Sequence, residues 1–198
     1  MRKRRLRSTE DAITYHVNRN HAAIFEGGGQ QNRLDRCRIM IVKALSQLKA
    51  PATIWELGCG SCDISGPFSA THHVTGVECV AEAPAVVADR FPSVQVWVAP
   101  VEILKPQPVG ILVACEFLEH IADPLQIMRD WLPLAKFAVI GHPLCPPDKD
   151  PEDGHMWSYD ESDLDGWAQL GGHKVIEREI YPMACYDKMG LILTGLNA

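Results

Sequence analysis

The chain has 198 residues, of which 46% are hydrophobic, and a formal net charge of −6. This length supports one well-packed core and is too short for two ordinary domains. No apolar run approaches the roughly 20 residues that a membrane helix needs, and the basic start leads into polar residues rather than the apolar stretch of a signal peptide. We therefore expect a single-domain protein in the cytoplasm, with no membrane as partner.

The first residues are strongly basic. Five basic side chains fall between Arg2 and Arg7, so the remainder of the chain is acidic. We interpret residues 1–10 as a flexible, solvated arm. Because a basic arm also attracts phosphate, nucleic acid stays an alternative partner.

Two helices are predicted ahead of the first strand. The first covers about residues 12–25 and is ended by the glycines after Glu26. The second covers about residues 32–48, where apolar residues recur at helical spacing before Pro51. The seven cysteines are an odd number scattered along the chain, which favours buried, reduced thiols over a disulfide framework.

A nucleotide-cofactor site is predicted where the apolar run Thr53–Leu57 breaks into glycines. Gly58 and Gly60 allow a sharp turn and a close approach of ligand to backbone, and a helix is expected to start near Asp63. Glu56 sits at the end of this strand. A carboxylate there favours a positively charged ligand over a pyrophosphate, because like charges repel.

A second acidic residue ends the next strand, which is predicted over residues 74–78. Glu78 falls about 20 residues past the glycines, where an acid accepts hydrogen bonds from the ribose hydroxyls of a nucleotide. The third glycine of a dinucleotide-binding G-x-G-x-x-G pattern would fall at Asp63. This makes a nicotinamide-dependent reductase a weaker alternative.

Strands and helices alternate through the rest of the chain. Further strands are predicted over residues 94–98, 110–115, 137–141, 174–180 and 191–196. Asp123 followed by Pro124 is a typical helix start. The alternation predicts an α/β fold with a doubly wound, mostly parallel seven-stranded sheet, an antiparallel last strand and helices on both faces.

Two motifs resemble one known family. Residues 56–61, with the sequence Glu-Leu-Gly-Cys-Gly-Ser, resemble the first motif of class I S-adenosylmethionine-dependent methyltransferases, although Cys62 replaces the usual third glycine. Residues 116–124 resemble that family's E-x-x-E-H-x-x-D-P string. The resemblance implies a Rossmann-like core over residues 51–198, covered by lid helices within residues 11–50, in a single methyltransferase domain over residues 11–198.

The resemblance implies S-adenosylmethionine as cofactor. Its binding residues would follow the ends of successive strands: Glu56, Gly58, Cys59, Gly60, Glu78, Cys79, Val101, Glu102 and Glu116. Pro100 stands where relatives often place an acid that contacts adenine. We therefore assign that contact to backbone groups near Val101 or to Glu102.

Candidate catalytic residues follow the later strands. His120, His142 and His155 are expected on loops at the carboxyl ends of strands, where ligands of α/β sheets bind. With Glu119, they could orient an acceptor or remove its proton.

The same region offers a donor set for a divalent cation. Glu116, Glu119, His120 and His155 could bind magnesium, manganese or zinc, and the string is similar to that of metal-dependent small-RNA 2′-O-methyltransferases. E-x-x-E-H also occurs in relatives with no known metal, so we do not favour metal dependence.

The expected activity is transfer of a methyl group from S-adenosylmethionine to an oxygen or nitrogen atom of a small molecule by in-line displacement. One alternative is an RNA methyltransferase of the 2′-O type, with or without a metal ion, reached through the Arg2 to Arg7 arm. Another is a catalytically silent partner protein, motivated by the departures from the family pattern at Cys62 and Pro100.

Overall fold

The computed structural model describes residues 2–3, 28–146, 154–183 and 187–196. The predicted first helix and the basic arm beyond Lys3 lie outside the described residues. Within the described ranges, no helix is both long and apolar enough to cross a bilayer.

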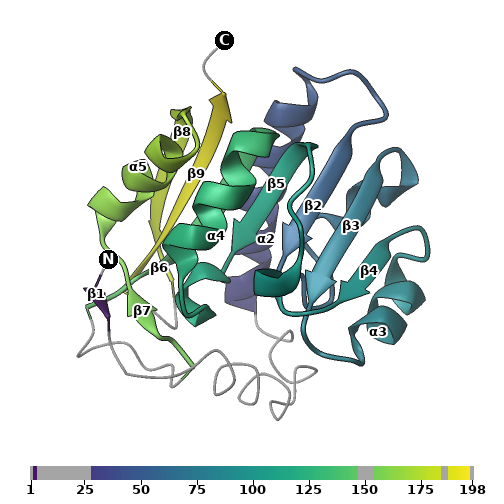
Figure 1. The fold of residues 1–198 in the computed structure, drawn as a ribbon, viewed down its shortest axis with the longest axis horizontal. Helices are drawn as coiled ribbons and strands as arrows, with labels where there is room; N and C mark the ends of the chain where they lie inside the picture. The colour runs from purple at the N-terminus through teal and green to yellow at the C-terminus, as the bar shows by residue number, and fades with distance from the viewer. Residues whose placement is uncertain (1, 4–27, 147–153, 184–186, 197–198) are drawn as a thin grey trace.

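A seven-stranded sheet forms the centre of the molecule, in the order β4-β3-β2-β5-β6-β9-β8 (Figure 1). Its strands are β2 Thr53–Leu57, β3 His73–Glu78, β4 Gln95–Val98, β5 Val109–Cys115, β6 Ala135–Leu144, β8 His173–Pro182 and β9 Lys188–Leu196. Strands β2 to β6 pair in parallel, whereas β9 is antiparallel to both of its neighbours, β6 and β8. This topology confirms the predicted fold class.

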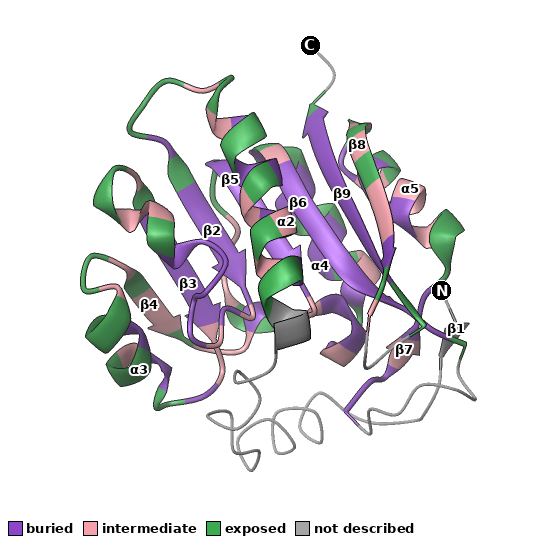
Figure 2. Cartoon of the chain, turned by 180° about the vertical axis from the view of Figure 1, so that it is seen from behind, coloured by how far each residue is buried: buried purple, intermediate pink, exposed green. Residues whose placement is uncertain are grey.

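Helices cover both faces of the sheet. The helices α2 Gly28–Leu45 and α3 Ala83–Arg90 pack on one face, and α4 Pro124–Trp131 and α5 Glu161–Leu170 pack on the other (Figures 1 and 2). Strand β5 is buried along its whole length, with Ile111 and Val113 facing α2 and Leu112 facing α4. Burial on both faces explains why this strand is a continuous apolar run in the sequence.

The strand order reverses between β2 and β5. From β2 the chain continues to β3 and β4 on one side, and then crosses back to place β5 and β6 on the other. In open α/β sheets, ligands bind in the crevice beyond the carboxyl ends of the strands at such a reversal. Gly58 follows β2 and Glu116 follows β5, so these two residues flank that crevice.

The helix boundaries differ from prediction at two places. Helix α2 begins at Gly28 instead of near Asn32, and it ends at Leu45 instead of near Leu48. The helix predicted near Asp63 is wrong, because the chain forms turns there and then the 3-10 helix Gly66–Ala70 (η2). A left-handed residue at Cys62 prevents a continuous right-handed helix from starting in this turn.

The capping predictions agree with the structure. Asp123 Oδ1 accepts a hydrogen bond from the Gln126 amide at 3.0 Å, and Pro124 is the first residue of α4. The remaining 3-10 helices are Val101–Ile103 (η3), Leu118–His120 (η4) and Leu132–Leu134 (η5).

A small two-stranded sheet lies beside the main one. Its strand β1, Arg2–Lys3, pairs antiparallel with β7, Trp157–Ser158. Two residues of the predicted flexible arm are thus paired with the segment that follows His155 (Figure 1).

Candidate functional site

The glycine turn after β2 has left-handed backbone at three alternating residues. The φ angles are 65° at Gly58, 50° at Gly60 and 58° at Cys62. A Cβ atom on Gly58 would lie 2.4 Å from the Phe117 ring, so space as well as backbone conformation requires glycine there. The turn thus places backbone without side chains at the crevice between β2 and β5.

Cys62 adopts the backbone conformation that a third glycine would otherwise supply. Left-handed backbone costs a residue with a side chain about 1–2 kcal/mol. The thiol is fully buried and makes compensating contacts, because its Sγ donates to Glu56 Oε2 at 3.4 Å and lies 3.2 Å from Ser65 Oγ. The side chain therefore packs inside the turn.

Glu56 holds the turn together from within. Its buried Oε2 accepts hydrogen bonds from the backbone amide of Ser65 at 3.0 Å and from the Ser65 hydroxyl at 2.5 Å. Burial raises the pKa of Glu56 to about 7, although the hydrogen bonds from Ser65 oppose this shift. These partners belong to the loop itself, and direct contact between Glu56 and a cofactor stays a prediction.

Glu78 lies at the end of β3, next to the turn. Its Oε2 accepts the Gly60 amide at 2.9 Å, and its Oε1 accepts the amides of Cys79 at 2.7 Å and Val80 at 3.2 Å. These contacts fix the carboxylate in position. The Cys79 thiol also donates to Oε1 at 3.3 Å, so Oε1 is fully occupied. Because a carboxylate oxygen can accept about two hydrogen bonds, Oε2, which has one partner, keeps the capacity to accept a ribose hydroxyl.

The other predicted cofactor residues lie along the same edge of the sheet. Burial and the charge of Glu78 raise the pKa of the Cys79 thiol to about 12, which keeps the thiol protonated at neutral pH. Cys59 is buried, and its amide donates to Val77 at 3.0 Å, joining the turn to β3. In η3, beyond β4, Val101 is buried and Glu102 is exposed. The cofactor contacts of these residues stay predictions.

Glu116 stands on the other side of the crevice. It has left-handed backbone with a φ of 51°, and its amide donates to Gly141 at 2.8 Å. Its carboxylate forms an ion pair with Arg33 of α2. The sequence analysis missed Arg33, because nothing in the pattern of the helix distinguishes this arginine from its neighbours.

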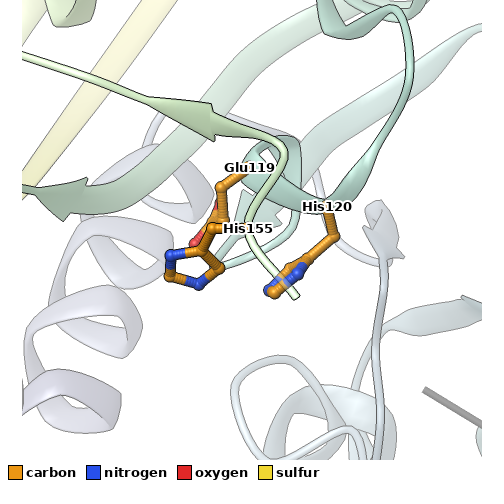
Figure 3. A group of neighbouring side chains, drawn as sticks. All are labelled: Glu119, His120 and His155. Carbon is orange, nitrogen blue, oxygen red and sulfur yellow. The ribbon is translucent and has the colours of Figure 1, made fainter. Parts of the chain in front are cut away.

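Three of the candidate catalytic residues lie close together in the structure. Glu119 and His120 belong to η4, and His155 lies just ahead of β7. Each residue offers one ligand atom, and these atoms lie within 4.8 Å of one another. Figure 3 shows the three side chains extending side by side, and the two imidazole rings are 4.7 Å apart. The Met156 amide donates to the backbone oxygen of Glu119 at 2.7 Å and joins the two segments. We call these three residues the rim cluster.

His142 lies apart from the rim cluster. The loop predicted for it is wrong, because β6 keeps pairing with β9 as far as Leu144 and makes His142 a fully buried strand residue. Its Nε2 accepts the Trp167 indole N–H at 3.1 Å, which leaves the proton on Nδ1, 3.3 Å from the Pro143 carbonyl. Burial lowers the pKa of His142 to about 4. A neutral histidine with both ring nitrogens engaged suits a structural role.

The predicted cation ligands are only partly brought together. Glu119, His120 and His155 form the rim cluster, whereas Glu116 pairs with Arg33. Two imidazoles and one carboxylate are a donor set that several divalent cations accept, and the same groups can also move a proton.

Comparison with known proteins identifies the fold. No protein-family model matches the chain, and no curated protein sequence matches it. Among solved structures, magnesium protoporphyrin IX methyltransferase from Synechocystis PCC 6803 with bound S-adenosylhomocysteine is similar, with a TM-score of 0.77 and 12% identity, covering 96% of this chain and 99% of that one.

Two further structures are similar. The N-methyltransferase NodS from Bradyrhizobium japonicum WM9, with S-adenosylhomocysteine, has a TM-score of 0.75 and 10% identity, covering 97% of this chain and 100% of that one. The Burkholderia thailandensis 1,6-didemethyltoxoflavin-N1-methyltransferase, with bound 1,6-didemethyltoxoflavin and S-adenosylhomocysteine, has a TM-score of 0.72 and 14% identity, covering 96% of this chain and 87% of that one. The chain therefore has the fold of class I S-adenosylmethionine-dependent methyltransferases, and the resemblance of its motifs is confirmed at the level of fold.

The buried Glu56 makes a prediction about stability and pH. Because its pKa rises from an ordinary value of 4.5 to about 7 on folding, the stability that protonated Glu56 contributes is fully present below pH 4.5 and is lost as pH rises through 7. Glu56→Gln keeps an acceptor for Ser65 but does not ionise. At each pH, the quantity of interest is the free energy of unfolding of the variant minus that of wild type. We expect this difference to be about 3 kcal/mol larger at pH 8 than at pH 4.

Urea unfolding at the two pH values measures this difference. Glu102→Gln, at an exposed residue of the same sheet edge, is the control and should change little. If the difference in free energy of unfolding between Glu56→Gln and wild type is the same at both pH values, the raised pKa of Glu56 is contradicted.

Proposed function

We propose that this protein is an S-adenosylmethionine-dependent methyltransferase that methylates an oxygen or nitrogen atom of a small molecule. The observation that carries the proposal is the juxtaposition of the glycine turn and Glu78 at the reversal of strand order. Gly58 and Gly60 form a left-handed backbone turn at the carboxyl end of β2, and Glu78 is a fixed acceptor beside this turn. The solved structures of the same fold that hold S-adenosylhomocysteine support this choice of cofactor.

In the proposed complex, the adenosyl group lies over the carboxyl ends of β2, β3 and β4. Glu78 accepts the ribose hydroxyls, and the segment Val101 to Glu102 contacts adenine. The sulfonium lies near the glycine turn, where nearby carboxylates favour a cationic ligand. Glu56 acts mainly by keeping the turn in shape, because its carboxylate is occupied by Ser65.

The reaction is a displacement at the methyl carbon of the cofactor. The acceptor's lone pair forms the new bond to the methyl carbon while the carbon–sulfur bond breaks. The electron pair of the broken bond stays on sulfur, which gives neutral S-adenosylhomocysteine. A proton leaves the acceptor to a base or to water. The protein's main contribution is to align the two reactants and exclude water.

The rim cluster is proposed to face the acceptor. Its residues lie beyond the carboxyl end of β5, on the side of the crevice that carries Glu116. His120 is half-buried, whereas Glu119 and His155 are buried, so His120 is the member best placed to take a proton from the acceptor. Its Nδ1 lies 3.3 Å from the Gly154 carbonyl, which leaves Nε2 as the proposed base. The small-molecule substrate named for the Burkholderia structure supports an acceptor of this size.

RNA is the second candidate acceptor. Pairing of β1 with β7 brings Arg2 and Lys3 next to the segment that carries His155. A methylation activity on RNA that falls steeply with rising salt would favour this candidate. The proposed location is the cytoplasm, a reducing compartment that suits the six free cysteines among the described residues.

The ribose assignment predicts the behaviour of Glu78→Ala. Loss of hydrogen bonds to a charged acceptor should weaken binding of S-adenosylhomocysteine by about 10- to 100-fold, measured by calorimetric titration. Glu82→Ala, an exposed acid just ahead of α3, is the control and should bind as wild type does. Unchanged affinity in Glu78→Ala would refute the ribose contact, and no binding by folded wild type would refute the enzyme itself.

The proposed role of the rim cluster predicts that a substitution there lowers turnover without changing the affinity for the cofactor. We expect His120→Ala to lower kcat by about 10²- to 10⁴-fold while leaving the affinity for S-adenosylhomocysteine unchanged. Turnover is followed as release of S-adenosylhomocysteine, with a panel of phenol, catechol and amine acceptors. Equal turnover by variant and wild type would exclude His120 as the base.

A chelator distinguishes proton transfer from metal binding at the rim cluster. We expect turnover to persist in excess EDTA, since a histidine base needs no cation. Loss of turnover in EDTA and recovery with added magnesium or manganese would instead assign Glu119, His120 and His155 as metal ligands.

A further inference from the structure

Asp63 fastens the end of the glycine turn to the rest of the structure. Its side chain reaches back into the turn, where Asp63 Oδ2 accepts a hydrogen bond from the Ser61 hydroxyl at 2.6 Å. Both side chains are buried. Ser61 lies between Gly60 and Cys62, which both have left-handed backbone, so this hydrogen bond supports the turn where its conformation is costly.

Helix α2 binds the backbone of Asp63. The Arg38 guanidinium donates two hydrogen bonds to the Asp63 backbone oxygen, from Nη2 at 2.6 Å and from Nε at 3.1 Å. Asp35, almost one turn earlier in the helix, accepts from the remaining Nη1 at 3.3 Å. Because a guanidinium is planar and presents its donors in a fixed geometry, these contacts fix both the distance and the direction between helix and turn.

Helix α3 binds the carboxylate of Asp63. Arg90, the last residue of α3, forms an ion pair with Asp63 Oδ1 at 2.5 Å. The Asp63 side chain is 8% exposed, and a carboxylate buried to this extent is costly unless cations or hydrogen-bond donors accompany it. Helices α2 and α3 lie on the same face of the sheet (Figure 2), so Asp63 is a shared attachment point that joins both of them to the turn.

Two other ion pairs of α2 lead away from the turn. Arg36 pairs with Glu179 and Lys43 pairs with Glu177, and both acids belong to β8 at the far edge of the sheet. These pairs hold the helix on the sheet without contacting the turn. They therefore provide a comparison for Arg38 within the same helix.

We propose that Arg38 and Asp63 are positioning residues, which place the glycine turn for the cofactor without touching it. Glu56 and Glu78 hold the turn from β2 and β3, but neither contact joins it to the helices. Loss of Arg38 leaves the turn folded but free to move against α2. Ligand binding must then order the turn as well, which lowers the affinity. This inference rests on the proposed function, because it assumes that the turn binds an adenosyl ligand.

Two other roles for Arg38 make different predictions. If Arg38 bound the charged amino-acid end of the cofactor, its loss would weaken only ligands that carry that end. If it merely held α2 on the sheet, loss of Arg36 would lower the affinity to the same extent. A positioning role weakens every adenosyl ligand alike and is specific to Arg38.

The test is calorimetric titration of wild type, Arg38→Met and Arg36→Met with two ligands. S-adenosylhomocysteine carries the amino-acid end, and 5′-methylthioadenosine lacks it. We expect Arg38→Met to weaken both ligands by about 10-fold, because two hydrogen bonds from a charged donor are lost. Arg36→Met is the matched control and should change neither affinity.

Two further measurements separate affinity from folding. Urea unfolding of both variants gives the stability that each substitution removes, and we expect Arg36→Met to lose stability without losing affinity. Arg38→Lys should recover part of the affinity for both ligands, because lysine keeps the charge but not the planar fork. If Arg38→Met does not fold, Arg38→Lys gives the same comparison with a smaller loss.

Each outcome decides the proposal. Equal weakening of both ligands in the Arg38 variants, with unchanged affinity in Arg36→Met, supports it. Weakening of S-adenosylhomocysteine alone, equal weakening by Arg36→Met, or unchanged affinity in the Arg38 variants overturns it while leaving the proposed cofactor intact. If folded wild type binds neither ligand, the proposed function fails and this inference fails with it.

Discussion

Two carboxylates hold the glycine turn, and the rest of the site is arranged around that turn. Glu56 binds Ser65 inside the turn, and Glu78 binds the Gly60 amide beside it. Together they stabilise a segment with three left-handed residues, one of which, Cys62, has a side chain. The cost of that backbone is offset by hydrogen bonds that a ligand does not need to supply, so the crevice is preformed.

The carboxylates also differ in what they can offer a ligand. Glu56 is buried and hydrogen-bonded within the loop, Glu78 is fixed at the end of β3, and Glu116 forms an ion pair with Arg33. Even with Glu56 partly protonated at neutral pH because of its raised pKa, one arginine beside these acids favours a ligand whose net charge is positive. S-adenosylmethionine fits this balance, because it carries a sulfonium and an ammonium against one carboxylate. The product of the proposed reaction has lost the sulfonium charge, which would favour its release.

Local patterns in the sequence were sufficient for most of the fold. Continuous apolar runs predicted the buried strands, and Asp123 and Pro124 predicted the start of α4. What the sequence analysis missed at the site comes from contacts between distant segments. Pairing of β6 with β9 buries His142, and the partner of Glu116 lies 83 residues away in α2. Neither contact corresponds to a periodic pattern or a residue spacing that can be recognised in a single sequence.

A crystal structure with S-adenosylhomocysteine tests the account most directly. It predicts the ribose hydroxyls within hydrogen-bonding distance of Glu78 and the sulfur beside the glycine turn. The rim cluster should face the open side of the sulfur. A complex in which the ligand lies outside the crevice between β2 and β5, or in which Glu78 keeps its present partners and makes no contact with the ribose, would contradict it.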